Sequence, residues 1–124
     1  MKRISTGSPF EARMGYSRAV VKGGWCFVSG VTGYDYATMQ MPPDAAGQAR
    51  NCFATIADVL AQAGFAMADI VRVQYTVTAP DIVDEVTPVL GEVLGEIRPA
   101  ATMVVAGLIR PEMLIEIEAT AFKG

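Results

Sequence analysis

Only two segments of this chain repeat their apolar side chains every three to four residues, the spacing of an amphipathic helix. The first covers residues 45–63, bounded by Asp44, which can cap free amide groups, and by Gly64, which favours a left-handed stop. The second opens at Pro80-Asp81 and contains Pro88, which must either kink the helix or restart it. Two helices cover one face of a sheet and leave the other face without a cover.

Two short apolar runs near the start of the chain, residues 18–22 and 25–29, are separated by Gly23-Gly24. Because glycine accepts positive φ, this arrangement predicts a tight β-hairpin. Residues 30–41 have the composition of a loop, and residues 2–5 are a candidate for one more short strand.

Three later segments are predicted to be strands. Residues 71–78 and 114–122 alternate apolar and polar side chains, so each is expected to have one buried face. Residues 101–108 are almost all apolar and lie between chain-breaking residues, which is typical of a central strand buried on both faces. In the last strand Glu116 and Glu118 share a face, about 7 Å apart along the chain.

The order β-β-α-β-α-β-β over residues 1–124 predicts a single α+β domain with both helices on one face of a mixed sheet. The other face carries Glu116 and part of the 101–108 strand, and it needs a second cover. Because 52% of the residues are hydrophobic, we expect that cover to be another copy of the same chain.

The residue types of the chain exclude several classes of function. A net charge of −3 with only ten Lys and Arg argues against a nucleic-acid partner. The absence of histidine removes the commonest general base and metal ligand. Cys26 and Cys52 lie in apolar surroundings, so we expect two buried reduced thiols. With neither a secretory signal nor a membrane-spanning run, we expect a soluble, cytoplasmic protein.

The candidates for chemistry are therefore carboxylates, hydroxyls, backbone groups and arginines. Glu116 and Glu118 either keep a solvated face soluble, or one of them lies at a subunit interface where burial tunes it to hold a water molecule. Tyr16 and Ser29 are ordinary hairpin residues on their own, and each arginine is on its own a surface cation.

Four stretches of the sequence resemble a known family. The signature of the RidA family (YjgF-like reactive intermediate/imine deaminases, also called the L-PSP endoribonuclease family) is similar to RPAATMVVAGL at residues 98–108 and LIEIEA at residues 114–119. The family's N-terminal hairpin is similar to GYSRAV at residues 15–20 and FVSG at residues 27–30. The resemblance implies a chorismate-mutase-like fold and a homotrimer with a cleft between subunits. It also implies hydrolysis of small-molecule enamines and imines to carbonyl compounds and ammonia, without a cofactor.

Carried over residue by residue, the resemblance places the water-positioning acid at Glu116 and the aromatic side chain of the cleft at Tyr16. The strand-end serine of the family becomes Ser29, with Gly30 beside it. The arginine that binds the substrate carboxylate in the family becomes Ala101.

Two further positions of the family site differ in this chain: Met103 stands where many members have cysteine, and Thr87 stands where many have asparagine. Without the arginine, a carboxylate loses a charge-assisted pair worth about 1.5–3 kcal/mol. The cleft also becomes more apolar, which suits a larger or uncharged ligand. Arg18 and Arg98 are the candidate replacements.

Three functions are open on this basis. The first is a Rid-type enamine/imine hydrolase whose substrate range is altered by Ala101. The second is a non-catalytic trimeric protein that binds a metabolite or a partner. The third is a ribonuclease, which the acidic charge balance and the absence of histidine disfavour.

Overall fold

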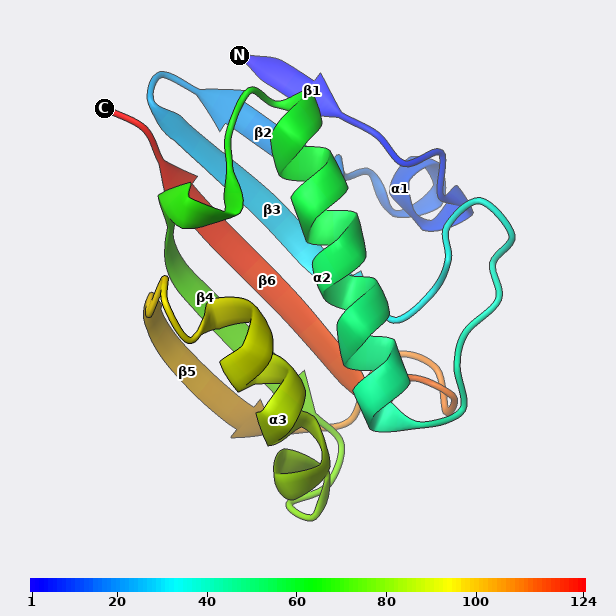
Figure 1. Ribbon diagram of the computed structural model, residues 1–124. Helices are drawn as coiled ribbons and strands as arrows, with labels where there is room; N and C mark the ends of the chain where they lie inside the picture. The colour runs from blue at the N-terminus through cyan, green and yellow to red at the C-terminus, as the bar shows by residue number, and fades with distance from the viewer.

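Six strands form one mixed sheet, and both long helices lie on the same face of it, in the computed structural model, which describes residues 1–124 (Figure 1). The strands are β1 (Lys2–Ile4), β2 (Ala19–Lys22), β3 (Trp25–Thr32), β4 (Ile70–Val77), β5 (Ala100–Val105) and β6 (Ile115–Phe122). The helices are α1 (Pro9–Met14), α2 (Ala45–Gln62) and α3 (Ile82–Leu94), with a 3-10 turn at Met67–Asp69. The predicted α+β fold, with two helices on one face of a mixed sheet, is confirmed.

The spatial order of the strands is β1-β2-β3-β6-β4-β5. Only β4 and β5 run parallel, and the other neighbouring pairs are antiparallel. The last strand therefore inserts in the middle of the sheet, where Glu116 pairs with Thr32 of β3 and Thr76 of β4. This topology brings Glu116 beside Thr32, although the two residues are far apart in the sequence.

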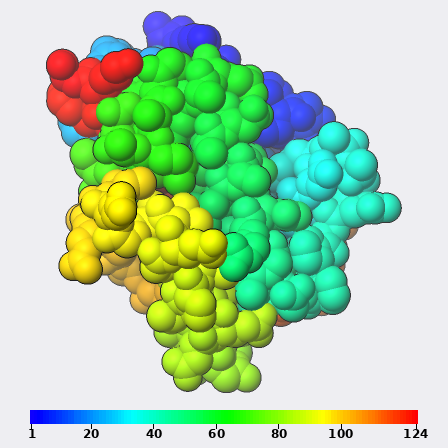
Figure 2. Space-filling view, viewed as in Figure 1, coloured from blue at the N-terminus to red at the C-terminus, as the bar shows by residue number.

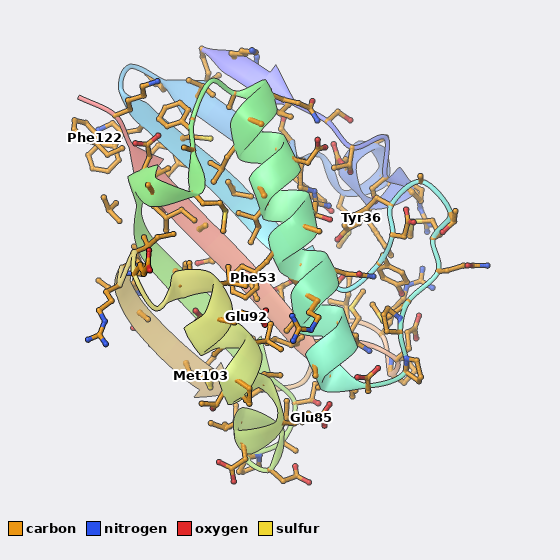
Figure 3. All side chains as sticks on the ribbon, viewed as in Figure 1. Tyr36, Phe53, Glu85, Glu92, Met103 and Phe122 are labelled. Carbon is orange, nitrogen blue, oxygen red and sulfur yellow. The ribbon has the colours of Figure 1, made fainter.

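Helix α2 forms where the sequence predicts it. The Oδ2 of Asp44 accepts a hydrogen bond from the backbone N–H of Gly47 at 3.0 Å, which caps the free amides of the first turn. The chain leaves the helix through Gly64, whose φ is +84°. The predicted apolar stripe is buried against the sheet; Phe53, 4% exposed, belongs to it (Figure 3).

Helix α3 continues through Pro88 as one helix, so it does not restart there. Thr87, the residue before Pro88, does not cap a second helix. Its hydroxyl donates back to the carbonyl of Val83 at 2.6 Å, inside the same helix. Because proline has no N–H, the carbonyl of Asp84 lacks the usual helical donor.

The short helix α1 was not expected from the sequence, because six residues are too few to show a helical period. Its end signals are nevertheless present. Ser8 caps it by accepting from Phe10 N–H, Pro9 is its first residue, and Gly15 ends it in the left-handed region at φ +74°. The helix matters to the site because it carries the buried Glu11.

Strand β5 lies at the edge of the sheet, and five of its six residues are exposed. The prediction of a central strand buried on both faces over residues 101–108 is therefore wrong, and the strand ends at Val105. An apolar run does not reveal its position in a sheet. That position is decided by β6, which pairs with β4 on the side away from β5 and leaves β5 one neighbour.

The face of the sheet opposite the helices has no cover within the chain. Figure 2 shows the helix-bearing side, where α2 and α3 hide most of the strands. On the other side Trp25, Phe27 and Phe122 are 42%, 49% and 40% exposed. Their rings form one patch, with centroids 4.5 Å apart for Trp25 and Phe122 and 6.1 Å for Trp25 and Phe27. No helix combines the length and apolar surface that crossing a bilayer requires.

Candidate functional site

A break in the pairing of β3 with β6 creates the first part of the site. The register shifts between Val28, which pairs with Ala119, and Val31, which pairs with Ile117, so Ser29 and Gly30 bulge out of the ladder next to the Thr32–Glu116 pair. A Cβ on Gly30 would lie only 2.9 Å from each carboxylate oxygen of Glu116. The Glu116 carboxylate therefore lies directly against the backbone of the bulge, where a side chain at residue 30 would displace it.

Arg18 holds the bulge from the other side. Its side chain is 1% exposed, and its Nη1 donates to the carbonyl of Gly30 at 2.8 Å. Nη2 lies 3.4 Å from the hydroxyl of Tyr16, and the guanidinium carbon lies 4.6 Å from the ring centre of Tyr36. Arg18 therefore joins Tyr16 to Gly30 and is buried inside the chain. It is not free to bind a substrate carboxylate.

Glu11 of α1 gives Arg18 its counter-charge. One of its carboxylate oxygens lies 3.8 Å from Nε of Arg18, an atom that is buried and has no hydrogen-bond partner. The same oxygen accepts from the N–H and the hydroxyl of Thr6. Burial works against the charge of Glu11, but these hydrogen bonds and Arg18 outweigh it, so the pKa of Glu11 lies below its usual value. Sequence reasoning missed Glu11, which the capping signals around α1 could have placed.

Tyr16 and Ser29 line one depression between α1 and the hairpin. Its volume is about 540 Å³, and Glu11 and Val20 also line it. The hydroxyl of Ser29 donates to the carbonyl of Ser17 at 2.7 Å, which ties the bulge to the start of β2. We call Tyr16, Arg18, Ser29, Gly30 and Glu116 the bulge cluster, because the fold brings these five predicted residues together.

The carboxyl group of Glu116 is electrostatically unlike an ordinary surface acid. Burial raises its pKa, and the neighbouring charge of Glu118 raises it further, while the positive charge of Arg18 acts in the opposite direction. Glu118 is exposed, and no comparable contact holds it. Of the two acids on this strand, only Glu116 combines partial burial with contact to the bulge.

The remaining predicted residues, Thr87, Ala101 and Met103, lie elsewhere. Ala101 and Met103 pair with Val73 and Tyr75 of β4, whose side chains are buried on the helix-bearing face. Figure 3 shows Met103 beside α3, on the far side of α2 from Tyr36. Because Glu116 alternates with two buried core residues, it points to the opposite face from Ala101.

A groove of about 280 Å³ lies between α3 and β5, and we call it the α3/β5 groove. Its wall residues are Val73, Tyr75, Leu90, Leu94 and Ala101. Thr87 and Arg98 also line it. Arg98, and not Arg18, is therefore the arginine next to the position where Ala101 stands.

Two other features contain none of the predicted site residues. A depression of about 460 Å³ lies between α2 and the loop at residues 34–37, and Asn51, Thr55 and Asp58 are among the residues that line it. Cys26 and Cys52 are both buried and unpaired, as predicted, and burial raises the pKa of each thiol. No three Cys, Asp or Glu side chains converge to hold a metal ion.

Comparison with known proteins gives consistent matches along the whole chain. The model of the family described as Endoribonuclease L-PSP matches residues 6–123. A RutC family protein of Pyrococcus horikoshii is 32% identical over 87% of this chain and 86% of its own length. An uncharacterized protein of Streptomyces coelicolor is 28% identical over the full chain and 93% of its own length.

Solved structures agree with these sequence matches. Rv2704 of Mycobacterium tuberculosis, described as a member of the YjgF/YER057c/UK114 family, is 40% identical, covers 98% of both chains and has a TM-score of 0.90. The YjgF gene product of E. coli is 26% identical, covers all of both chains and has a TM-score of 0.89.

Proposed function

This chain belongs to the endoribonuclease L-PSP family, the YjgF-like or RidA family, and from that premise we propose that it hydrolyses reactive enamines and imines to carbonyl compounds and ammonia. The observation that carries the proposal is the contact between the half-buried Glu116 carboxylate and the Gly30 bulge. A half-buried carboxyl group with a raised pKa beside a break in the strand ladder is suited to hold water and to exchange protons with a substrate.

The reaction needs few groups because the carbon of an iminium ion is already electrophilic. Glu116 accepts a proton from water as the water oxygen bonds to that carbon, and the electron pair of the C=N bond moves to nitrogen. Glu116 then returns this proton to the nitrogen, the C–N bond breaks and ammonia leaves, while the hydroxyl proton passes to Glu116 and a C=O bond forms. The ammonia takes up that last proton as ammonium ion, which regenerates the carboxylate. Tyr16 and the backbone of Ser29 and Gly30 orient the substrate in this scheme.

A complete site requires a second copy of the chain under this proposal. Glu116 and Ala101 point to opposite faces of one sheet, so the bulge cluster and the α3/β5 groove of a single chain cannot hold one small molecule. A neighbouring copy brings its groove to the bulge cluster of the first. The exposed aromatic patch and the unpaired edge of β5 offer the surfaces for such contacts, which supports a homotrimer with shared clefts.

Ala101 alters the substrate range in this proposal. No cation replaces the missing guanidinium within the bulge cluster, because Arg18 is buried and engaged. Small imino acids that depend on a two-pronged carboxylate contact are therefore poor substrates. A non-catalytic binding role for the same cleft is the second candidate, and the same engagement of Arg18 favours it.

A coupled assay tests the function. A pyridoxal-phosphate enzyme or an amino-acid oxidase generates imines in situ, and the release of ammonia and carbonyl product is followed. We expect Glu116→Gln to lower the rate by about 10²-fold or more, as for loss of a positioned acid–base group. Glu118→Gln is the matched control on the same strand and keeps activity. A bound carbonyl ligand with no turnover of any imine would instead support the binding role.

A further inference from the structure

The α3/β5 groove contains the most apolar concave surface near the predicted site residues. Val73 and Leu94 are 1% and 6% exposed, and they form its floor with the ring of Tyr75. The Tyr75 hydroxyl has no hydrogen-bond partner in the chain, and burial raises the pKa of Tyr75 to about 12. Leu90 completes the wall on the helix side.

The groove is open because small residues stand where larger ones would fill it. Ala101 contributes only a methyl group from β5, and Gly91 contributes no side chain from α3. A Cβ on Gly91 would meet no atom within 4 Å, so this part of the groove is empty space. The volume of about 280 Å³ lies just below the roughly 300–1,000 Å³ of whole small-molecule sites, so the groove fits part of a ligand.

A cation stands at the side of this groove. Arg98 has φ +51°, a left-handed conformation that is uncommon for a residue with a side chain. Its Nε donates to the carbonyl of Gly95 at 3.0 Å, which fixes the start of the guanidinium group at the end of α3. The two Nη groups make no hydrogen bond within the chain and remain available to an anion.

We infer that the α3/β5 groove binds the apolar side chain of the substrate and that Arg98 pairs with its carboxylate. The substrate class is then the imine or enamine of a 2-oxo acid with a branched aliphatic or aromatic side chain. This inference rests on the proposed function for its reaction, but the binding that it describes is independent of turnover. This substrate class differs from the small imino acids that the family's arginine binds at the position of Ala101.

Direct binding tests the inference without any reaction. Methyl-labelled protein is titrated with two product-like probes, 3-phenyl-2-oxopropanoate and 2-oxopropanoate, while NMR follows the methyl groups of Leu90 and Leu94. We expect the phenyl compound to shift both signals and to bind at least tenfold more tightly than 2-oxopropanoate. Equal affinity for the two probes, or shifts confined to residues outside the groove, would overturn the inference.

Two variants separate the parts of the contact. Gly91→Leu fills the empty space and is expected to weaken binding of the phenyl compound tenfold or more while leaving 2-oxopropanoate unchanged. Gly107→Leu is the matched control, because a Cβ at residue 107 also meets nothing within 4 Å. Arg98→Met keeps the apolar stem and removes the charge, so it should weaken both probes.

The outcomes also distinguish this inference from the proposed reaction. Groove binding without hydrolysis of any imine would leave the ligand class standing and contradict the reaction. Hydrolysis of small imines that is unaffected by Gly91→Leu, with no shift at Leu90 and Leu94, would leave the reaction standing and contradict the ligand class.

Discussion

The carboxylate of Glu116 fills the space that a side chain at Gly30 would need, with both oxygens 2.9 Å from the position of a Cβ. The atoms in that space are the flexible end of Glu116, so Gly30→Ala is expected to cost little stability and to displace the acid. Activity should therefore fall by about tenfold or more, since a 1 Å misplacement in a site can cost as much as about 10²-fold. The check compares unfolding and steady-state rates with those of Gly107→Ala. A fully active Gly30→Ala protein would remove Glu116 from the mechanism.

The raised pKa of Glu116 has a consequence for stability. The folded protein holds this proton more tightly than the unfolded chain, so the group's contribution to stability falls as pH rises from the ordinary value of 4.5 through the folded pKa. Glu116→Gln should then be more stable than the natural protein at pH 7, and the difference should vanish below pH 4. Urea unfolding across this pH range measures it. A variant less stable than the natural protein at pH 7 would show that the contacts of the carboxylate outweigh its desolvation.

Arg18 and Glu11 form a buried pair whose halves depend on each other. Removing one member leaves the other charge buried without a partner, which costs about 3–5 kcal/mol in such pairs. We expect Arg18→Gln and Glu11→Gln each to destabilise the protein, and the double variant to lose clearly less than the sum. Urea unfolding of the four proteins gives the coupling energy. Additive losses would mean that the 3.8 Å approach contributes nothing.

Arg18 also lowers the pKa of Glu116 through its charge. In Arg18→Gln the pKa of Glu116 should therefore rise, and NMR of the side-chain carboxyl carbon follows that titration directly. Arg18→Lys keeps the charge but not the planar fork of donors. It should hold the pKa near its natural value while the hydrogen bond to Gly30 is lost. An unchanged titration in Arg18→Gln would assign Arg18 a packing role only.

Ala101→Arg tests the origin of the altered substrate range. A restored two-pronged contact is worth about 1.5–3 kcal/mol, or roughly 10- to 150-fold in rate for small imines. The gain is reduced by the cost of desolvating an arginine in an apolar groove. The same substitution should weaken binding of 3-phenyl-2-oxopropanoate. Strong hydrolysis of 2-aminoacrylate-type imines by the natural protein would refute the idea that Ala101 removed this activity.

The aromatic patch predicts a dependence of assembly on Phe27. We expect light scattering to show a trimer for the natural protein and a smaller species for Phe27→Asp, because the substitution places a charge in an apolar contact. Ala61→Asp adds the same charge on the exposed side of α2 and should leave the trimer intact. A natural protein that stays monomeric at micromolar concentration would contradict the shared-cleft proposal.

Patterns within single segments decided most of the secondary structure. The stripe of α2, its cap at Asp44 and the alternation in β6 are local properties, because a helix or strand with one apolar face has one stable orientation against a core. The resemblance in the sequence likewise singled out Glu116 over Glu118, and the structure gives Glu116 the contact and the partial burial that Glu118 lacks.

Tertiary structure alone decided where β5 lies and what surrounds each arginine. The apolar run of β5 is equally compatible with the centre or the edge of a sheet, and only the insertion of β6 between β3 and β4 places it at the edge. Arg18 and Arg98 are alike as sequence letters. Arg18 is buried against Glu11 and Tyr36, whereas Arg98 lies at the end of α3 and lines the α3/β5 groove. The sequence alone does not separate them, because the environment of a charge depends on contacts between residues far apart in the chain.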